Sequence, residues 1–381
     1  VIEDVRLALE TRRASPWRAQ IPEEVFRRWV LPHRVAQEPP QPWRQKLHGM
    51  LAPRVRGLSL RDAILETNRF CREQATFIPT SARDQGPLTT MRRGLGRCEE
   101  ETILFISAAR SVGIPARPAW TPWWMSGDNN HAWVEAWDGE RWRYLGACEP
   151  ATALDEAWFT EPARRAGLVL SGAYGEGPVA GEELYSAAAG VTLLNSTGVY
   201  TTPGRLSVEW ADAAPGADTA RASERVFVHV FNSGSLAVLA EFAAGASILL
   251  GPGDYVVTAA PEGRAAGAFV RVEPGAPAVA RLDPRGGEEG LRELLAAPFR
   301  LRIPQPPPRE PARIPQAASG DAAGAAEVAA AAAVKALEDS LRAVGRERAR
   351  ADSIRLDGHE RALRSLDPAR AGDVLETVRQ V

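Results

Sequence analysis

Apolar residues recur at helical spacing through the first part of the chain. Segments 2–10 and 23–30 carry apolar positions three or four residues apart, which predicts two amphipathic helices. The proline-rich run 39–43 then interrupts the pattern. A further helix is expected over 58–74, because its apolar residues fall roughly on one side and its Arg and Glu residues on the other. Those apolar residues are Leu58, Ala63, Ile64 and Phe70.

The clearest helical pattern covers residues 98–117, CEEETILFISAARSVGIPAR. Its apolar stripe consists of Ile103, Leu104, Ile106, Ala108 and Val112. Gly113 suits the left-handed conformation that ends many helices, and Pro115 cannot continue one. The pattern therefore predicts a helix that begins near Cys98 and stops near Gly113.

In residues 131–137, HAWVEAW, large or polar side chains alternate with Ala and Val, which predicts a β-strand. One face would carry His131, Trp133, Glu135 and Trp137. The dipeptide Asp138-Gly139 that follows favours a two-residue hairpin turn. A turn centred there would pair Trp137 with Glu140, Glu135 with Trp142 and His131 with Gly146.

The sequence pattern changes near residue 190, where short segments that alternate apolar and polar residues are separated by Gly and Pro turns. These segments are 205–210, 225–232, 236–242, 247–260 and 268–275. In the second of them Val226, Val228 and Val230 would face a core, and Arg225 and His229 the solvent. The pattern predicts an antiparallel β-sandwich over about 198–284.

The remaining residues are poor in large apolar side chains. Residues 285–322 form a proline-rich linker, and we expect its run 302–316 to be extended. Residues 323–381 are rich in alanine and charge, which predicts a helical tail too weakly hydrophobic to form a core. We interpret it as a solvated linker or a helix that needs a partner. Ten of the 11 tryptophans lie between Trp17 and Trp158, so the aromatic core belongs to the N-terminal half.

Composition and charge narrow the class of protein. Of the 381 residues 45% are hydrophobic and 25% charged, as in a soluble globular protein. The net charge of −2 argues against a nucleic-acid partner. Three cysteines are too few for a disulfide framework. We expect no transmembrane segment, because no apolar stretch reaches about 18 residues. The chain opens on VIEDVR without a leader or an initiator Met, which leaves its cellular location open.

Cys98 is the first candidate for chemistry. It lies at the predicted start of a helix, where the helix dipole and free N–H groups favour a thiolate and can stabilise an oxyanion. The three glutamates that follow oppose this effect, so Cys98 would need a base nearby. A buried, inert cysteine is the alternative. His131 is the candidate base, since a cysteine–histidine dyad requires closeness in space and not in sequence. A histidine at a strand start can equally be structural.

The two motifs carry a family resemblance. The segment RGLGRCEEETILFISAARSVGIPAR followed by NNHAWVEAWDGERWRYLGACEP resembles the transglutaminase-like superfamily of cysteine enzymes, in particular its bacterial members. The LGACEP segment is also similar to the DACE segment of peptide:N-glycanases. The resemblance implies an α+β fold with a papain-like core, in which a helix bearing Cys98 packs on an antiparallel sheet. It also implies that Cys98 is the nucleophile and His131 its general base.

One position departs from the family pattern. The family places a third catalytic residue, usually Asp, at the position that Gly146 occupies here. Glu149 could reach back to the His131 ring, or a backbone carbonyl or a water near Gly146 could accept its N–H. A catalytically weak site is the third interpretation.

Other residues near the motifs have open interpretations. Cys148 could form a regulatory disulfide with Cys98 or be a buried thiol. Trp123, Trp124 and Trp133 could form a flat wall for a peptide or sugar, or could pack the hairpin. A metal site of Cys98, Cys148 and His131 would lack a fourth ligand, so we expect neither a metal nor another cofactor.

The resemblance divides the chain into parts. We expect a helical extension over 1–57, a catalytic domain over 58–190, and a sandwich that resembles Ig-like or carboxypeptidase-regulatory modules. Such modules accompany extracytoplasmic bacterial enzymes, which favours a periplasmic or secreted location.

Two functions then compete. The first is a cysteine enzyme that acts on amide bonds of peptides or proteins through a thioester, by hydrolysis more than by cross-linking. The second is a weak or inactive scaffold that binds a peptide or glycan. The presence of both Cys98 and His131 favours the enzyme.

Overall fold

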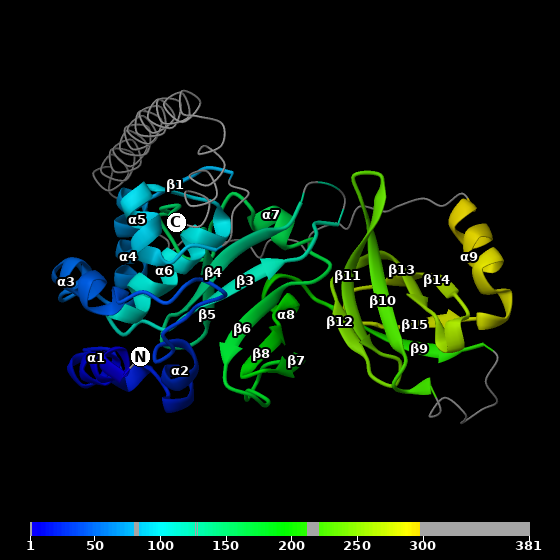
Figure 1. Ribbon diagram of the computed structural model, residues 1–381, viewed down its shortest axis with the longest axis horizontal. Helices are drawn as coiled ribbons and strands as arrows, with labels where there is room; N and C mark the ends of the chain where they lie inside the picture. Colours follow the sequence, from blue (N-terminus) through cyan, green and yellow to red (C-terminus); the bar gives the residue numbers. More distant parts are fainter. Residues whose placement is uncertain (1, 80–83, 126, 128, 212–220, 298–381) are drawn as a thin grey trace, which may run out of the picture.

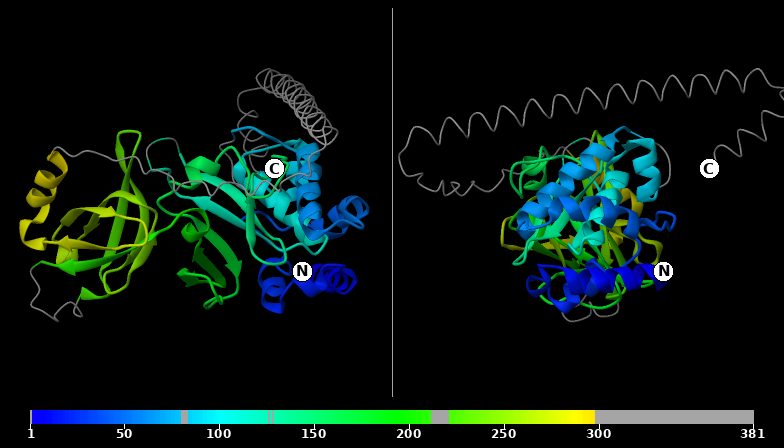
Figure 2. Two further views of the ribbon diagram at one scale, coloured as in Figure 1. Left: turned by 180° about the vertical axis from the view of Figure 1, so that it is seen from behind. Right: turned by 90° about the vertical axis from the view of Figure 1, so that its left-hand side faces the viewer.

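The computed structural model describes residues 2–79, 84–125, 127, 129–211 and 221–297. The chain is a mixed helix and sheet protein in which a helix-and-sheet part is followed by a smaller β-sheet part (Figures 1 and 2). The Ala-rich tail predicted over 323–381 and the run 302–316 lie outside the described residues. Within the predicted linker, the described residues include helix α9 (Gly287–Ala296), which packs on strand β14 (Ala266–Val272).

In the described residues, six α-helices precede the main sheet in the sequence. They are α1 (Ile2–Ala14), α2 (Glu23–Trp29), α3 (Trp43–Val55), α4 (Leu60–Gln74), α5 (Pro87–Arg93) and α6 (Cys98–Ser111). Four of them confirm the helices predicted from apolar spacing. Helix α3 was not predicted, because it begins at Trp43, the last residue of the proline-rich run, and contains Pro53. Its buried residues Trp43, Leu47, Leu51 and Val55 nevertheless form one stripe at four-residue spacing.

Helix α6 ends where the sequence indicates. Val112 is its C-cap, and Gly113 follows with φ of +86°, a conformation that glycine adopts without steric cost. Pro115 then leads into strand β3. Nearly the whole helix is buried, and its apolar residues share a cluster with Val134 and Ala136 of the sheet. This packing fixes the start of α6 relative to the strands.

The main sheet has six strands in the order β5-β4-β3-β6-β8-β7, and every neighbouring pair in it is antiparallel. The strands are β3 (Ala116–Thr121), β4 (His131–Trp137), β5 (Trp142–Leu145), β6 (Leu170–Tyr174), β7 (Leu184–Ala188) and β8 (Val191–Asn195). Helices α4, α5 and α6 lie on the same side of β3 and β4 (Figure 1). Strands β6 to β8 were not predicted, and β8 continues the sheet beyond residue 190.

A buried polar network supports the strand that begins at His131. Arg117 of β3 and Glu135 of β4 form an ion pair of 2.6 Å, and both side chains are fully buried. Arg117 also pairs with Glu182 at 2.7 Å. The hydroxyl of Tyr200 donates to Glu135 at 2.6 Å and accepts the indole N–H of Trp133 at 2.7 Å. Because Trp133 and Glu135 share the face of His131, this network anchors that face of the strand.

Residues 204–282 form two further sheets around one buried cluster. One has the order β11-β10-β13-β14 and the other β12-β9-β15. The strands are β9 (Gly204–Trp210), β10 (Arg225–Asn232), β11 (Ser235–Ala243), β12 (Ile248–Leu250), β13 (Gly253–Ala259), β14 (Ala266–Val272) and β15 (Pro277–Leu282). Val226, Val228 and Val230 are in the core as expected. His229 is half-buried and not in solvent, since its Nε2 pairs with the Thr258 hydroxyl of β13 at 2.8 Å. The likeness of this part to Ig-like modules stays a prediction.

Candidate active site

Cys98 is the first residue of α6. The chain reaches it through strand β2 (Leu95–Gly96), which pairs in parallel with β1 (Thr76–Phe77). The N-cap residue Arg97 donates its backbone N–H to Glu100 Oε2 at 2.8 Å, and this capping contact closes the first turn of the helix. The thiol is thereby fixed at a helix N-terminus, as the sequence predicts.

The three glutamates that follow Cys98 have three different environments. Glu100 caps the helix, as described above. Glu99 accepts a hydrogen bond from the Cys98 thiol, with 3.1 Å between Sγ and Oε2, and one from Asn130 Nδ2 at 3.3 Å. Glu101 is 2% exposed and lines the cavity next to Cys98. The acidic run is therefore not a uniform solvated face.

The thiol of Cys98 is protonated in this arrangement. Burial raises its pKa, and the charge and hydrogen bond of Glu99 raise it further, to about 12. The backbone N–H of Ala132, which hydrogen-bonds the sulfur, acts in the opposite direction. Burial and Glu99 therefore outweigh the N–H donors at the helix start, and Cys98 needs a base to become a thiolate.

His131 is the first residue of β4, and its ring lies among aromatic side chains. The centroid of the ring is 4.8 Å from that of Trp158, 5.0 Å from Phe159 and 5.7 Å from Trp133. Trp124 stacks farther away, at 6.2 Å. These ring contacts restrict the orientation of the His131 imidazole.

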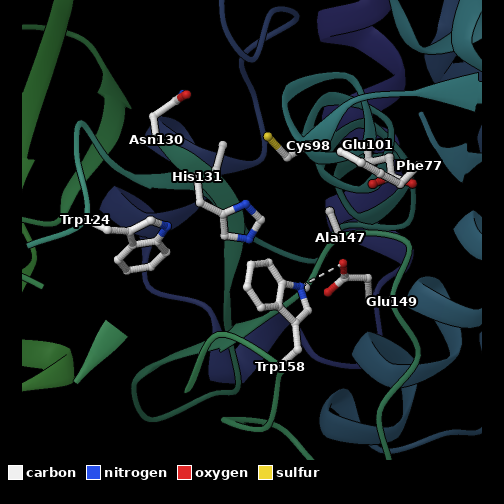
Figure 3. A pocket seen from close by; sticks show the side chains of 11 residues that line it. Phe77, Cys98, Glu101, Trp124, Asn130, His131, Ala147, Glu149 and Trp158 are labelled. Atoms are coloured by element: carbon white, nitrogen blue, oxygen red, sulfur yellow. Dashed lines mark hydrogen bonds between the residues drawn. The ribbon is translucent and has the colours of Figure 1, made fainter. Parts of the chain in front are cut away.

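Cys98 and His131 line one cavity of about 380 Å³. Figure 3 shows both side chains directed into it. Its lining also includes Ala132 at the start of β4 and Glu149 after β5. The structure thus brings together the cysteine, the histidine and the carboxylate that the sequence singled out, although their catalytic roles stay predictions.

The register of the hairpin differs from the predicted one. Trp137 pairs with Trp142, and Glu135 with Tyr144, so the turn holds the four residues 138–141 and not two. The reason is the Asp138 side chain, whose Oδ1 accepts the backbone N–H groups of Glu140 at 3.0 Å and Arg141 at 2.9 Å. Strand β5 ends at Leu145, so Gly146 is not the cross-strand partner of His131.

Gly146 and Glu149 share one space. A Cβ atom added to Gly146 would lie 1.9 Å from Glu149 Oε2 and 2.9 Å from Glu149 Cβ. The Glu149 side chain therefore occupies the volume that a side chain at position 146 would fill. Its Oε1 accepts the indole N–H of Trp158 at 3.1 Å (Figure 3). Oε2 is buried and accepts no hydrogen bond from the described residues.

The turn that carries Glu149 is held by Asn68 of α4, which the sequence did not reveal. Asn68 is fully buried, and its Nδ2 donates to the carbonyl of Gly146 at 2.9 Å and to that of Glu149 at 2.8 Å. Between these residues Cys148 has a φ of +57°, a left-handed conformation that costs free energy outside glycine. The tight turn aims the Glu149 side chain back toward Gly146.

The predicted tryptophan wall is only partly present. Trp124 lines the cavity, but Trp133 is fully buried under the strand and Trp123 packs against the cluster of the two C-terminal sheets. Trp123 and Trp133 therefore do not face the Cys98 cavity. Trp158, which the sequence did not single out, lines the cavity and is 60% exposed. It lies in an irregular segment, where no periodicity marks the direction of a side chain.

Cys148 does not approach Cys98. It is fully buried, and its neighbour is the thiol of Cys71 on α4. It is also absent from the cavity lining, and all three cysteines are free thiols. The hypothesis of a Cys98–Cys148 disulfide is wrong for this fold, because the turn at 146–149 directs Cys148 into the core.

A second hollow of about 440 Å³ adjoins the first at Asn130 and Ala132. Its walls are mostly apolar and include Trp120, Tyr174 and Leu193. Glu99 also lines it. The two hollows together offer space on both sides of the segment that begins β4.

The described part of the chain offers neither a metal site nor a membrane span. Its residues contain no group of three or more His, Cys, Asp and Glu side chains arranged to hold a metal ion. None of the helices in the described ranges is long and apolar enough to cross a membrane.

Comparison with known proteins gives one family match. Residues 51–147 match the sequence model of the transglutaminase-like superfamily. The chain is 17% identical to a candidate cysteine protease of known structure from Cytophaga hutchinsonii, with a TM-score of 0.29, over 37% of this chain and 48% of that one. It is 14% identical to a candidate protease from Parabacteroides distasonis, with a TM-score of 0.26, over 66% of this chain and 52% of the other. The chain thus spans about half the length of each. No curated protein matches.

Proposed function

Because residues 51–147 form a transglutaminase-like core, we propose that this chain is a cysteine enzyme that hydrolyses amide bonds of peptides or proteins. The observation that carries the proposal is the joint position of Cys98, at the first turn of α6, and His131, at the first residue of β4, on one cavity. A nucleophile and a base within one hollow are what thiol-dependent acyl transfer requires.

His131 acts as a general base during the attack. Since the Cys98 thiol is protonated in the resting state, its proton moves to the imidazole as the sulfur bonds to the amide carbonyl carbon. Backbone N–H groups at a helix N-terminus can stabilise an oxyanion, and the position of Cys98 as the first residue of α6 brings the reacting carbonyl close to them. The imidazolium then protonates the leaving amine, the C–N bond breaks, and a thioester remains on Cys98.

Glu149 serves as the third group. Its carboxylate occupies the space of a side chain at position 146, which is the position that the family pattern gives to Asp. The partner-free Oε2 is available to stabilise the imidazolium that forms on His131. Glu149 also binds Trp158, whose ring packs against His131, so it positions the imidazole through that contact as well.

Hydrolysis is favoured over transfer to an amine because the cavity wall is open to water. Two side chains that line the cavity are largely exposed: Trp158 is 60% and Phe77 50% exposed. Water can therefore reach the thioester and release the acid. The second hollow, across Asn130 and Ala132, gives room for the rest of an extended peptide.

The test is peptide cleavage measured by mass spectrometry. The full chain is incubated with a digest of denatured proteins, and new termini are counted for wild type, Cys98→Ala and His131→Ala. Cleavage by wild type alone supports the proposal. New termini at equal yield from Cys98→Ala would contradict it. A wild type that retains peptides without cleaving them would instead favour the binding scaffold.

A further inference from the structure

We propose that Glu101 binds a protonated primary amine of the substrate on the floor of the Cys98 cavity, the part of its lining formed by Glu101, Glu149, Phe77 and Trp158. The inference rests on the proposed function and deepens it: the amide substrate would carry an ammonium group on the residue next to the scissile bond. Three independent features of the cavity support this class of ligand.

The first feature is Glu101. Its side chain is 2% exposed, yet its Oε1 accepts no hydrogen bond from the described residues. A buried polar atom without a partner costs about 1–3 kcal/mol, and more when it is charged. Such groups are rare in folded proteins, and a ligand that supplies the partner is one reason for a fold to retain them. Because Glu101 lines the cavity, a bound donor can reach this oxygen.

The second feature is the negative charge of the cavity floor. Glu149 lines the same floor, and its negative charge raises the pKa of Glu101. No Lys or Arg is among the described residues that line the cavity. Arg72, the cation that attracts both carboxylates, binds Thr76 and stays outside the lining. The floor therefore lacks a counter-charge that an ammonium ligand would provide.

The third feature is aromatic. Phe77 and Trp158 bound the same floor, and Figure 3 shows Phe77 beside Glu101 and Trp158 beside Glu149. Aromatic faces attract cations, by about 0.5–1 kcal/mol at sites that are open to water. Carboxylates together with aromatic faces select an ammonium group over a neutral or anionic one of the same size.

The position of Glu101 relative to Cys98 sets where the amine lies. The two residues are three positions apart on α6, so they share a face, with about 5–6 Å between Cβ atoms. An acyl group on the Cys98 sulfur therefore brings its nearest substituents to Glu101. This geometry places the ammonium on the residue that carries the reacting carbonyl or on its neighbour.

The test compares three chloroacetamides that alkylate Cys98 and differ only in the tail: 2-aminoethyl, 2-hydroxyethyl and carboxymethyl. Second-order rates at Cys98 are measured by peptide mass spectrometry for the full chain. We expect the cationic probe to react on the order of tenfold faster than the hydroxyl probe. The anionic probe should be the slowest. In Glu101→Gln the ratio of cationic to hydroxyl rate should fall toward one.

The control variant is Glu140→Gln, an equal change of charge at the exposed hairpin turn. It should keep the wild-type ratio. The rate ratio is internal to each protein, so partial misfolding of a variant affects both probes alike. Added NaCl should lower the ratio in wild type, which keeps the inference testable without any variant.

Equal rates for the cationic and hydroxyl probes in wild type would overturn the inference, as would a ratio that Glu101→Gln leaves unchanged. This failure is distinct from failure of the proposed function, because alkylation requires no turnover. A chain that cleaves peptides through Cys98 but shows no preference for the cationic probe loses only the ammonium site.

Discussion

The carboxylate of Glu149 lies where a side chain at position 146 would lie, since a Cβ on Gly146 would be 1.9 Å from Glu149 Oε2. We propose that two residues in this tight turn exchange a role: the position that the family pattern fills with Asp is Gly146 here, and the side chain of Glu149, three residues later, fills the space. Asn68 holds the backbone of both residues. The loss of the family Asp thus need not leave His131 without a carboxylate.

A double-mutant cycle tests this exchange. Glu149→Ala should reduce acylation of Cys98 by up to about 10⁴-fold, the scale for a lost triad carboxylate. Gly146→Ala should act in the same direction, because the added methyl expels the Glu149 carboxylate. The double variant should be no worse than either single one, since both remove the same group. Additive losses would show that Gly146 and Glu149 act separately.

Restoration of the family pattern gives a further prediction. Gly146→Asp alone forces two carboxylates into one space and should be poorly active. Gly146→Asp combined with Glu149→Ala removes the clash and should recover a large part of the wild-type rate. Single-turnover acylation measures both variants. If the double variant is no faster than Glu149→Ala, position 146 does not face His131 in the way we propose.

Glu99 should restrain the reactivity of Cys98. In Glu99→Gln the thiol loses the neighbouring charge that raises its pKa, so its pKa falls and more thiolate is present at neutral pH. Lower nucleophilicity offsets part of the gain, which leaves about a threefold rate increase for each tenfold rise in the acidity of the thiol. Rates of iodoacetamide labelling between about pH 6 and 10 compare the thiolate fractions of the two proteins. A profile identical to that of wild type would exclude this role.

The sequence predicts the helix and the strand that carry the site residues better than it predicts how the strands of the hairpin pair. The apolar stripe of α6 and the alternation of β4 are local patterns, so they correctly place Cys98 and His131 at the starts of a helix and a strand. The hairpin register depends on one side chain, Asp138, that accepts two backbone N–H groups and lengthens the turn. Trp158 and Asn68 reach the site through an irregular segment and a long-range contact, which no local pattern encodes.

Buried Glu101 should make stability fall as pH rises. Burial, followed by the charge of Glu149, raises its pKa well above the ordinary value, so the folded chain binds the proton more tightly than the unfolded chain. This contribution is fully present below the unfolded pKa, near 4.5, and is lost as pH rises through the folded pKa. Glu101→Gln lacks the effect. Its stability relative to wild type should therefore increase with pH, by about 1.4 kcal/mol for each pH step of one between the two pKa values. Urea unfolding at several pH values measures the difference, and a constant difference would contradict the expectation.

The ion pair of Arg117 and Glu135 should stabilise strand β4, which begins at His131. Arg117→Met leaves a fully buried carboxylate without its main partner, which typically costs about 3–5 kcal/mol. Glu135→Leu added to Arg117→Met removes that charge and should recover much of the loss. The free energy of unfolding in urea reports both variants. A cost below about 1 kcal/mol for Arg117→Met would mean that the pair is dispensable.

The most direct test of the account is acetylation of the protein by p-nitrophenyl acetate in a single turnover. We predict one equivalent of p-nitrophenol in a burst, with one acetyl group on the peptide that contains Cys98 and none on Cys71 or Cys148, which are fully buried. The burst should vanish in Cys98→Ala and slow by about 10²- to 10⁴-fold in His131→Ala, the range for loss of a general base. A His131→Ala variant that acetylates at the wild-type rate would contradict the claim that Cys98 and His131 act together.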